Sequence, residues 1–301
     1  MTLFLSLALA GGVAVVKSDS LTAYDAPATA VVAGLGGHTT VEVHDIKGDR
    51  DTAEDVMKEL RRDKPDVVVA LGPKAAWSVR EALPDTPLVY VMVSDPARYG
   101  IEGPLVTGVS ENVPPDALMA QVHLFAPEVQ RIGMVLHSDN QDARVAESIA
   151  AAERAGFELK VLRVTRERDV KGALLRLRDT VDAVWMVPDA VVVTPENFRF
   201  LREESRRIGM PVIASSEVLV QAGALMCVAP DYAVVGEQAA QLTLSILGGT
   251  SPSELPVLHP TAVRVVLNRE TMEAIELDID PMLLDFVDEV VGSEPGARTG
   301  R

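Results

Sequence analysis

The chain has 301 residues, a formal net charge of −16 at pH 7 and a sequence pI near 4.7. A protein this acidic is repelled by nucleic acid and by anionic membrane surfaces, so neither is an expected partner. The length exceeds what one hydrophobic core usually supports and predicts roughly two domains. The single cysteine, Cys227, excludes an internal disulfide framework, and its apolar neighbours predict a buried, unreactive thiol.

The N-terminal segment 1–10, MTLFLSLALA, is apolar and ends in the Ala-Leu-Ala typical of a signal-peptidase site. It lacks a basic n-region and is short for a signal peptide. Two interpretations stay open, a signal-peptide remnant and an extension of the first strand. No segment reaches the roughly 18 apolar residues of a membrane helix, so direct membrane insertion is not expected. Residues 293–301 are expected to form a flexible tail.

Segments with strand-like and helix-like patterns alternate along the chain. The first half predicts, in order, strand 13–16, helix 23–35, strand 39–46, helix 51–63, strand 66–72, helix 73–83, strand 87–95 and strand 105–110. The second half predicts helix 114–127, strand 131–139, helix 141–156, strand 157–165, helix 168–179, strand 182–189, helix 194–209, strand 211–217, a helical turn at 218–223, strand 224–230, helix 233–249, strand 262–268 and a last helix at 280–291.

The predicted strands are continuous runs of Val, Ile and Leu, which is typical of strands covered on both faces. Their alternation with helices predicts parallel sheets with right-handed crossovers. The strands form two sets of about five or six. The sequence therefore predicts an α/β protein with two doubly wound parallel-sheet lobes.

Ligands of open parallel sheets bind beyond the carboxyl ends of the strands. Small hydroxyls, carboxylates and amides follow nearly every predicted strand here. Each of them also suits the N-cap of a following helix, or a turn before proline in the case of Asp95, so the set carries more weight than any member. The set favours a small polar ligand held by many hydrogen bonds. The candidate ligand-binding residues are Ser18, Asp19, Gly72, Pro73, Lys74, Ser94, Asp95, Ser138, Asn140, Asp189, Ser215, Ser216 and Asp231.

Motifs of the common enzyme classes are missing. The glycine-rich stretch 34–39, GLGGHT, follows a helix and precedes a strand, which is the reverse of a dinucleotide-binding loop. There is no glycine-lysine phosphate loop and no Gly-x-Ser-x-Gly elbow, and the five histidines show no ligand spacing. The sequence therefore predicts no catalytic residue, no metal site and no cofactor. The aromatic residues nearest the predicted site are Tyr24, Tyr99 and Tyr232.

Several of these segments together resemble a known family. They are VSDP, VTGVS, RIGMVLHSDN, VDAVWMVPD, MPVIASSE, APDYAVVGEQAAQLTLSILGGTSPSELPV and VVLNRETMEAIELDIDPMLLDFVDEVV. In this order, from Asp66 to Val291, they resemble ABC-transporter substrate-binding proteins of the tryptophan/tyrosine type. The chain departs from many relatives at Gly72-Pro73-Lys74, where they have Gly-Thr-Pro or Gly-Thr-Ala, and at Ala190, where they have Asn.

The resemblance implies a type 1 periplasmic-binding fold, whose lobes are joined by three crossover segments and close over a ligand. We expect lobe 1 to comprise residues 11–113 with 231–257, and lobe 2 residues 114–230 with 258–292. The crossovers are expected near 110–115, 228–230 and 256–261.

By the same resemblance, the expected function is that of a monomeric, non-enzymatic solute-binding protein in the periplasm or another extracytoplasmic compartment. Its partners would be a small-molecule ligand, an amino acid or a similar solute, and the permease subunits of an ABC importer. Asp189 is the expected contact of a ligand amino group. One alternative is the ligand-sensing protein of a signalling system, and a less favoured one is a two-lobed sugar-nucleotide enzyme.

Overall fold

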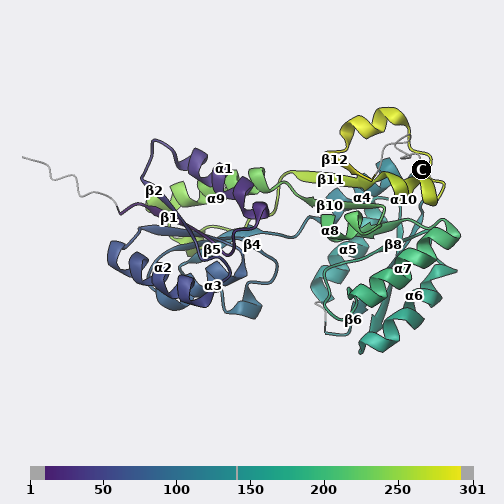
Figure 1. The fold of residues 1–301 in the computed structure, drawn as a ribbon, viewed down its shortest axis with the longest axis horizontal. Helices are drawn as coiled ribbons and strands as arrows, with labels where there is room; N and C mark the ends of the chain where they lie inside the picture. The colour runs from purple at the N-terminus through teal and green to yellow at the C-terminus, as the bar shows by residue number, and fades with distance from the viewer. Residues whose placement is uncertain (1–10, 140–141, 293–301) are drawn as a thin grey trace, which may run out of the picture. The chain divides into compact units, whose positions relative to one another are not determined.

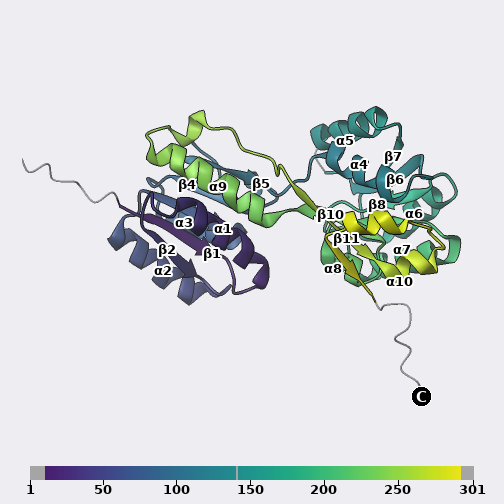
Figure 2. The same ribbon diagram turned by 90° about the horizontal axis from the view of Figure 1, so that it is seen from above.

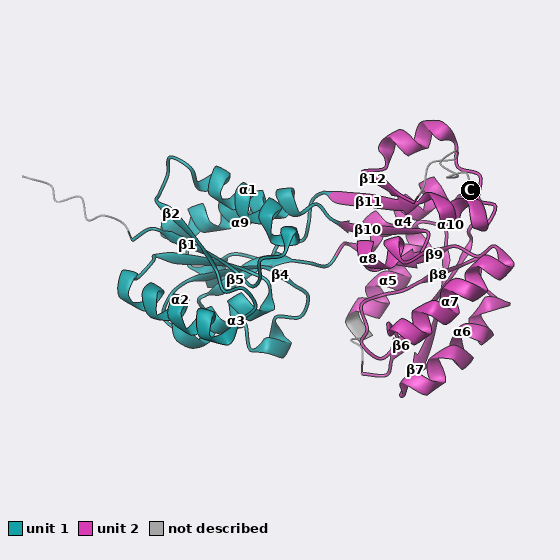
Figure 3. Ribbon diagram, in the orientation of Figure 1, with its two compact units in different colours: residues 1–112, 230–262 teal, residues 113–229, 263–301 magenta. Residues whose placement is uncertain are grey.

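A computed structural model describes residues 11–139 and 142–292. The expectations for residues 1–10 and 293–301 lie outside the described residues. The chain divides into two compact units, Met1–Asn112 with Pro230–Ala262 (unit 1) and Val113–Ala229 with Val263–Arg301 (unit 2) (Figure 3). The chain therefore passes from one unit to the other three times.

The third passage follows Ala262, directly after the segment 256–261 where a crossover was expected. Residues 258–262 belong to unit 1 because their backbone is hydrogen-bonded to it. The Leu258 N–H donates to the Gly108 carbonyl at 3.0 Å, and the Ser110 N–H donates to the Leu258 carbonyl at 2.8 Å. At the end of the segment, the Asp231 N–H donates to the Ala262 carbonyl at 3.1 Å. These ladder-like bonds join the ends of the three connecting segments within unit 1.

Unit 1 contains a five-stranded sheet in the order β2-β1-β3-β4-β5, and the neighbouring strands run parallel. The strands are β1 (Val13–Lys17), β2 (Val41–Asp45), β3 (Val67–Leu71), β4 (Leu88–Val93) and β5 (Val106–Ser110). The helices are α1 (Asp25–Leu35), α2 (Arg50–Asp63), α3 (Pro73–Ala82) and α9 (Tyr232–Leu247), with short 3-10 turns η1 (Thr22–Tyr24), η2 (Ala97–Tyr99) and η4 (Pro252–Glu254).

The central strands of unit 1 are buried on both faces, as their continuous apolar runs predict. Val13 and Val15 pack on the side of α1 and α9, whereas Ala14 and Val16 pack on the side of α2 and α3. The period-2 alternation of the strand thus supplies two separate cores. Figures 1 and 2 show α1 and α9 running side by side, although about 200 residues separate them in the chain.

Unit 2 contains a seven-stranded sheet in the order β12-β11-β10-β9-β8-β6-β7. Its strands are β6 (Arg131–His137), β7 (Glu158–Val164), β8 (Ala183–Trp185), β9 (Val212–Ala214), β10 (Met226–Pro230), β11 (Val263–Asn268) and β12 (Glu289–Val291). Its helices are α4 (Pro115–Phe125), α5 (Asp142–Arg154), α6 (Val170–Arg178), α7 (Pro195–Ile208), α8 (Glu217–Gln221) and α10 (Arg269–Ala274), with turns η3 (Glu167–Asp169) and η5 (Pro281–Phe286).

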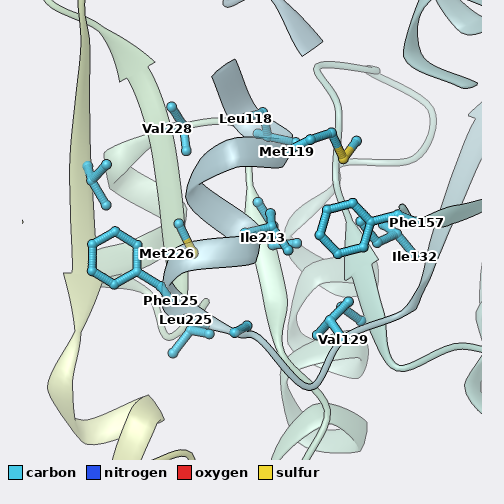
Figure 4. Packing of buried hydrophobic residues seen from close by; sticks show 14 of the residues in the cluster. Leu118, Met119, Phe125, Val129, Ile132, Phe157, Ile213, Leu225, Met226 and Val228 are labelled. Carbon is cyan, nitrogen blue, oxygen red and sulfur yellow. The ribbon is translucent and has the colours of Figure 1, made fainter. Parts of the chain in front are cut away.

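The sheet of unit 2 is also covered on both faces. Leu118 and Phe125 of α4 pack against Ile213 and Met226 on one face (Figure 4). Cys227, the next residue of β10, packs on the other face with α6 and α7. The predicted α/β class with two doubly wound parallel-sheet lobes is therefore confirmed.

One predicted element is wrong and one was not predicted. Residues 280–291 do not form a helix, because η5 is followed by β12, which pairs parallel with β11. Asp288 joins the two segments, since its N–H donates to the Val265 carbonyl and its carboxylate accepts from the Val265 N–H. Sheet pairing here overrides a helical pattern. Helix α10 was not predicted, although Asn268 caps it by accepting from the Thr271 N–H at 2.9 Å.

The contact between α1 and α9 depends on residues without bulky side chains. A Cβ atom on Gly236 of α9 would lie 2.5 Å from the Pro27 carbonyl oxygen and 2.8 Å from the Ala30 Cβ. The two helix backbones therefore approach more closely than an alanine would allow.

Gly236→Ala is expected to destabilise the protein by about 1–3 kcal/mol, because the added methyl group overpacks this interface and outweighs its gain in helix propensity. Gly172→Ala in α6 is the matched control, because a Cβ there meets nothing within 4 Å. It should stabilise by about 0.5–1 kcal/mol. Thermal and urea unfolding measure both effects, and an increase in stability for Gly236→Ala would contradict the packing argument.

Candidate functional site

Ser18 connects two elements at the carboxyl end of the sheet of unit 1. It follows β1 directly and is 2% exposed. Its Oγ accepts a hydrogen bond of 2.8 Å from the Ala75 N–H in the first turn of α3, and its own N–H donates to the Leu71 carbonyl at 2.9 Å. The side chain thus satisfies one of the free N–H groups at the start of α3.

Gly72 allows a close approach at this position. Its φ of +91° is in a region that favours glycine, and a Cβ there would lie 2.6 Å from the Tyr24 hydroxyl and 2.7 Å from Ser18 Oγ. Pro73 follows as the first residue of α3, where its missing N–H costs nothing. Ser18, Gly72 and Tyr24 therefore lie together at the ends of β1 and β3.

Tyr24 adds a protonated hydroxyl to this cluster. Burial raises the pKa of Tyr24 above its ordinary value of 10.0, a hydrogen bond with Ser18 opposes the shift, and the negative charges of Glu111 and Asp19 add to it. At neutral pH the hydroxyl keeps its proton and can donate as well as accept.

Charges of both signs border the cluster. The Lys74 Nζ donates to the Gly48 carbonyl at 3.3 Å. A Cβ on Gly48 would lie 2.5 Å from Asp19 Oδ2 and 3.2 Å from Lys74 Nζ, so the carboxylate and the ammonium are both beside Gly48. Such an edge complements a ligand that carries a positive and a negative group.

Ser94 and Asp95 follow a distorted strand end. Met92 in β4 has a φ of +58°, and the register with β5 shifts at this point. Bulges of this kind change the direction of the residues that follow and are common beside binding sites. Ser94 is exposed, whereas Asp95 accepts from the Arg98 N–H at 3.3 Å and so stabilises the following turn.

Asp189 organises the carboxyl edge of unit 2. Its Oδ2 accepts from the His137 N–H at 2.8 Å, and its Oδ1 accepts from the N–H groups of Val191 at 3.0 Å and Val192 at 3.2 Å. The carboxylate therefore joins the end of β6 to the loop that follows β8. A contact between Asp189 and a ligand amino group stays a prediction.

The other predicted residues of unit 2 lie at neighbouring strand ends. Ser138 follows β6 and is exposed, and its hydroxyl donates a hydrogen bond of 3.1 Å to the Asp139 carboxylate. Ser215 and Ser216 are half-buried after β9, and Ser216 begins α8 without a side-chain cap. Asn140 lies outside the described residues.

Asp231 lies in unit 1 and caps α9, because its Oδ1 accepts from the N–H groups of Ala233 at 2.9 Å and Val234 at 3.3 Å. The next residue, Tyr232, donates its hydroxyl proton to Glu111 Oε1 at 2.9 Å. Glu111 was missed in the sequence, because it follows a strand that ends in Ser110 and forms no recognisable motif.

A groove of about 920 Å³ lies between α2 and α3 in unit 1. Pro73 and Lys74 border it at the carboxyl edge, and the side chains of Trp77 and Tyr99 line it. Tyr99 therefore belongs to this groove, whereas Tyr24 and Tyr232 lie at the cluster of candidate residues.

Within residues 11–139 and 142–292, no three His, Cys, Asp or Glu side chains gather in a way that could hold a metal ion. Among the helices of the same residues, none combines the length and apolar character needed to cross a bilayer.

The sequence and the fold were compared with known proteins. The sequence profile of the family described as "ABC transporter substrate binding protein" matches residues 34–291. A tyrosine-binding protein of Clostridioides difficile is 22% identical over 250 residues, which are 80% of this chain and 72% of that protein.

Two solved structures have a similar fold. One is the ligand-free, open structure of a substrate-binding protein with adhesive properties from Clostridium difficile, with a TM-score of 0.72 and 21% identity over 94% of this chain and 99% of that one. The other is an ABC domain in complex with L-Trp from Streptococcus pneumonia, with a TM-score of 0.61 and 23% identity over 93% and 99%. At these identities the likeness shows the fold.

Asp189→Ala is expected to lower the free energy of unfolding by about 1–3 kcal/mol, because it leaves three backbone N–H groups without their acceptor. Urea denaturation measures the change. The control is Asp139→Ala. Because the Asp139 carboxylate is mainly exposed, its removal should change the free energy of unfolding by less than about 0.5 kcal/mol. Equal effects of the two substitutions would contradict the organising role of Asp189.

The Cys227 thiol is expected to resist alkylation in the folded protein. The residue is fully buried, and burial raises its pKa to about 12, so the reactive thiolate is scarce at neutral pH. Iodoacetamide at pH 8 should label Cys227 only after unfolding in urea, as measured by intact mass. Rapid labelling of the native protein would contradict this prediction.

Proposed function

Because the chain belongs to the ABC transporter substrate-binding protein family, we propose that it captures a small polar solute and delivers it to the permease subunits of an ABC importer. Family membership assigns a binding role, and we extend this to a protein that carries out no chemistry of its own. Capture outside the cytoplasmic membrane, closure of the two units about the three connecting segments and a monomeric state are parts of the same proposal.

The ligand class follows from the carboxyl edge of unit 1. A buried hydroxyl, a protonated tyrosine and charges of both signs lie within one small area. A free amino acid carries both an ammonium and a carboxylate, and it matches this arrangement better than a neutral sugar does. The tyrosine-binding relative and the L-Trp complex support an amino acid as the ligand.

Lys74 distinguishes this chain from many relatives, which have proline or alanine at this position. We propose that its ammonium meets the acidic end of the ligand, together with the backbone N–H of Lys74 itself in the first turn of α3. The remaining proposed contacts are Ser18, Asp19, Gly72, Pro73, Ser94, Asp95, Ser138, Asn140, Asp189, Ser215, Ser216 and Asp231.

A thermal-shift screen against the standard amino acids, short peptides, sugars and nucleotides tests the proposal. A ligand at about 100 times its dissociation constant should stabilise the folded protein by about 2.7 kcal/mol. We expect this from an amino acid. If a sugar nucleotide shifts the melting temperature and no amino acid does, the proposed function is wrong.

Lys74→Ala gives a second measurement in the same screen. The shift by the bound amino acid should fall, whereas Lys58→Ala, which removes an exposed lysine on α2, should leave it unchanged. Equal responses of the two variants would contradict the proposed contact of Lys74.

A further inference from the structure

A ligand ammonium needs a carboxylate with a free lone pair, and several carboxylates lie near the candidate residues. A carboxylate has about four lone-pair positions, and existing bonds reduce what remains for a ligand. The inference below rests on the proposed function, and it concerns which carboxylate receives the amino group of the bound amino acid.

Asp189 is already engaged by its own unit. Both of its oxygens accept backbone N–H groups, those of His137, Val191 and Val192. These bonds fix the loop after β8 and occupy lone pairs that a ligand ammonium would need. Its geometry is that of a residue that holds a loop in place.

Asp19 lies beside a cation. Its Oδ2 and the Lys74 ammonium both border Gly48. A positive charge beside the same glycine offsets part of the attraction of the carboxylate for a second cation. Asp19 is therefore suited to balancing Lys74 rather than to binding a ligand ammonium.

Glu111 differs from both. Its Oε1 accepts one hydrogen bond, of 2.9 Å, from the Tyr232 hydroxyl. In the described parts of the chain, Glu111 makes no ion pair, and its Oε2 accepts no hydrogen bond. The side chain is half-buried and follows β5, so it lies at the same carboxyl edge of the sheet of unit 1 as Ser18 and Gly72, and its negative charge contributes to the raised pKa of Tyr24.

The two tyrosines complete the surroundings. Tyr232 orients Glu111 through a single bond, and both it and Tyr24 are half-buried. Half-buried aromatic rings exclude water from part of a carboxylate, which strengthens a charge-assisted hydrogen bond to it. Their faces also attract cations.

We propose that Glu111 receives the ammonium of the bound amino acid and determines selectivity for ligands with a free amino group, with Tyr232 as its positioning residue. The solute class is then the α-amino acids, and acids that lack the amino group are rejected. Removing the amino group from a ligand leaves the carboxylate without its partner in a half-buried place, which is costly.

The test compares each ligand with its des-amino counterpart in calorimetric titrations. The probes are L-tyrosine and L-tryptophan, with 3-(4-hydroxyphenyl)propionate and 3-indolepropionate as their counterparts. Wild type should bind at least one of the amino acids about 10- to 100-fold more tightly than its counterpart. Glu111→Gln should weaken binding of the amino acid by about the same factor and leave the counterpart unaffected or tighter.

Three further variants make the result specific. Tyr232→Phe should weaken binding of the amino acid by about 2- to 10-fold and hardly change binding of the counterpart. Glu237→Gln, the same change of charge at an exposed position of α9, should change neither. Asp189→Asn should weaken binding of both ligands of a pair to a similar degree, because the substitution acts through the loop after β8.

The outcomes separate the two proposals. If wild type binds no amino acid in the thermal-shift screen, the proposed function fails and the role of Glu111 fails with it. If wild type binds an amino acid, but Glu111→Gln weakens binding of the amino acid and of its counterpart equally, or changes neither, only the role of Glu111 is overturned. If Asp189→Asn weakens binding of the amino acid alone, Asp189 and not Glu111 is the residue that receives the ammonium.

Discussion

The structure depends on parallel strands that are apolar on both faces. In each unit, helices cover the sheet above and below, so central strands such as β3, β9 and β10 consist of buried apolar residues along their length. In these central strands, polar groups are therefore confined to the strand ends. At the carboxyl ends, helix N-termini leave N–H groups that need acceptors. Ser18, Asp189 and Asp231 meet this need in three different places.

This confinement explains why structural and ligand-binding roles are difficult to separate. A hydroxyl or carboxylate after a strand can cap the next helix, join two loops or bind a solute. Asp231 and Asp95 accept nearby backbone N–H groups, and Asp189 holds a loop. Glu111 has no such duty in the described residues and is held by a side chain instead. The distinction depends on which lone pairs remain, so it requires the hydrogen bonds and not only the residue types.

The return of α9 to the first unit imposes a second constraint. The helix packs on α1 through Gly236, and its buried Gln238 holds the third connecting segment by donating to the His259 carbonyl and accepting from the Thr261 N–H. Close packing and a buried amide thus attach a distant part of the chain to the sheet of unit 1. Because a buried amide must be hydrogen-bonded, this attachment is specific as well as tight.

Periodicity and composition alone determined the α/β class, nearly every helix and strand, the paired lobes and the carboxyl strand ends as the place of the candidate residues. These features follow from local patterns, since apolar runs and capping residues act over a few positions. Tertiary structure decided the conformation of residues 280–291, where a 3-10 turn and a strand paired with β11 replace the predicted helix. It also brought Glu111 to Tyr232, which is 121 residues away in the chain. Such contacts depend on how sheets and helices pack, and no local pattern records them.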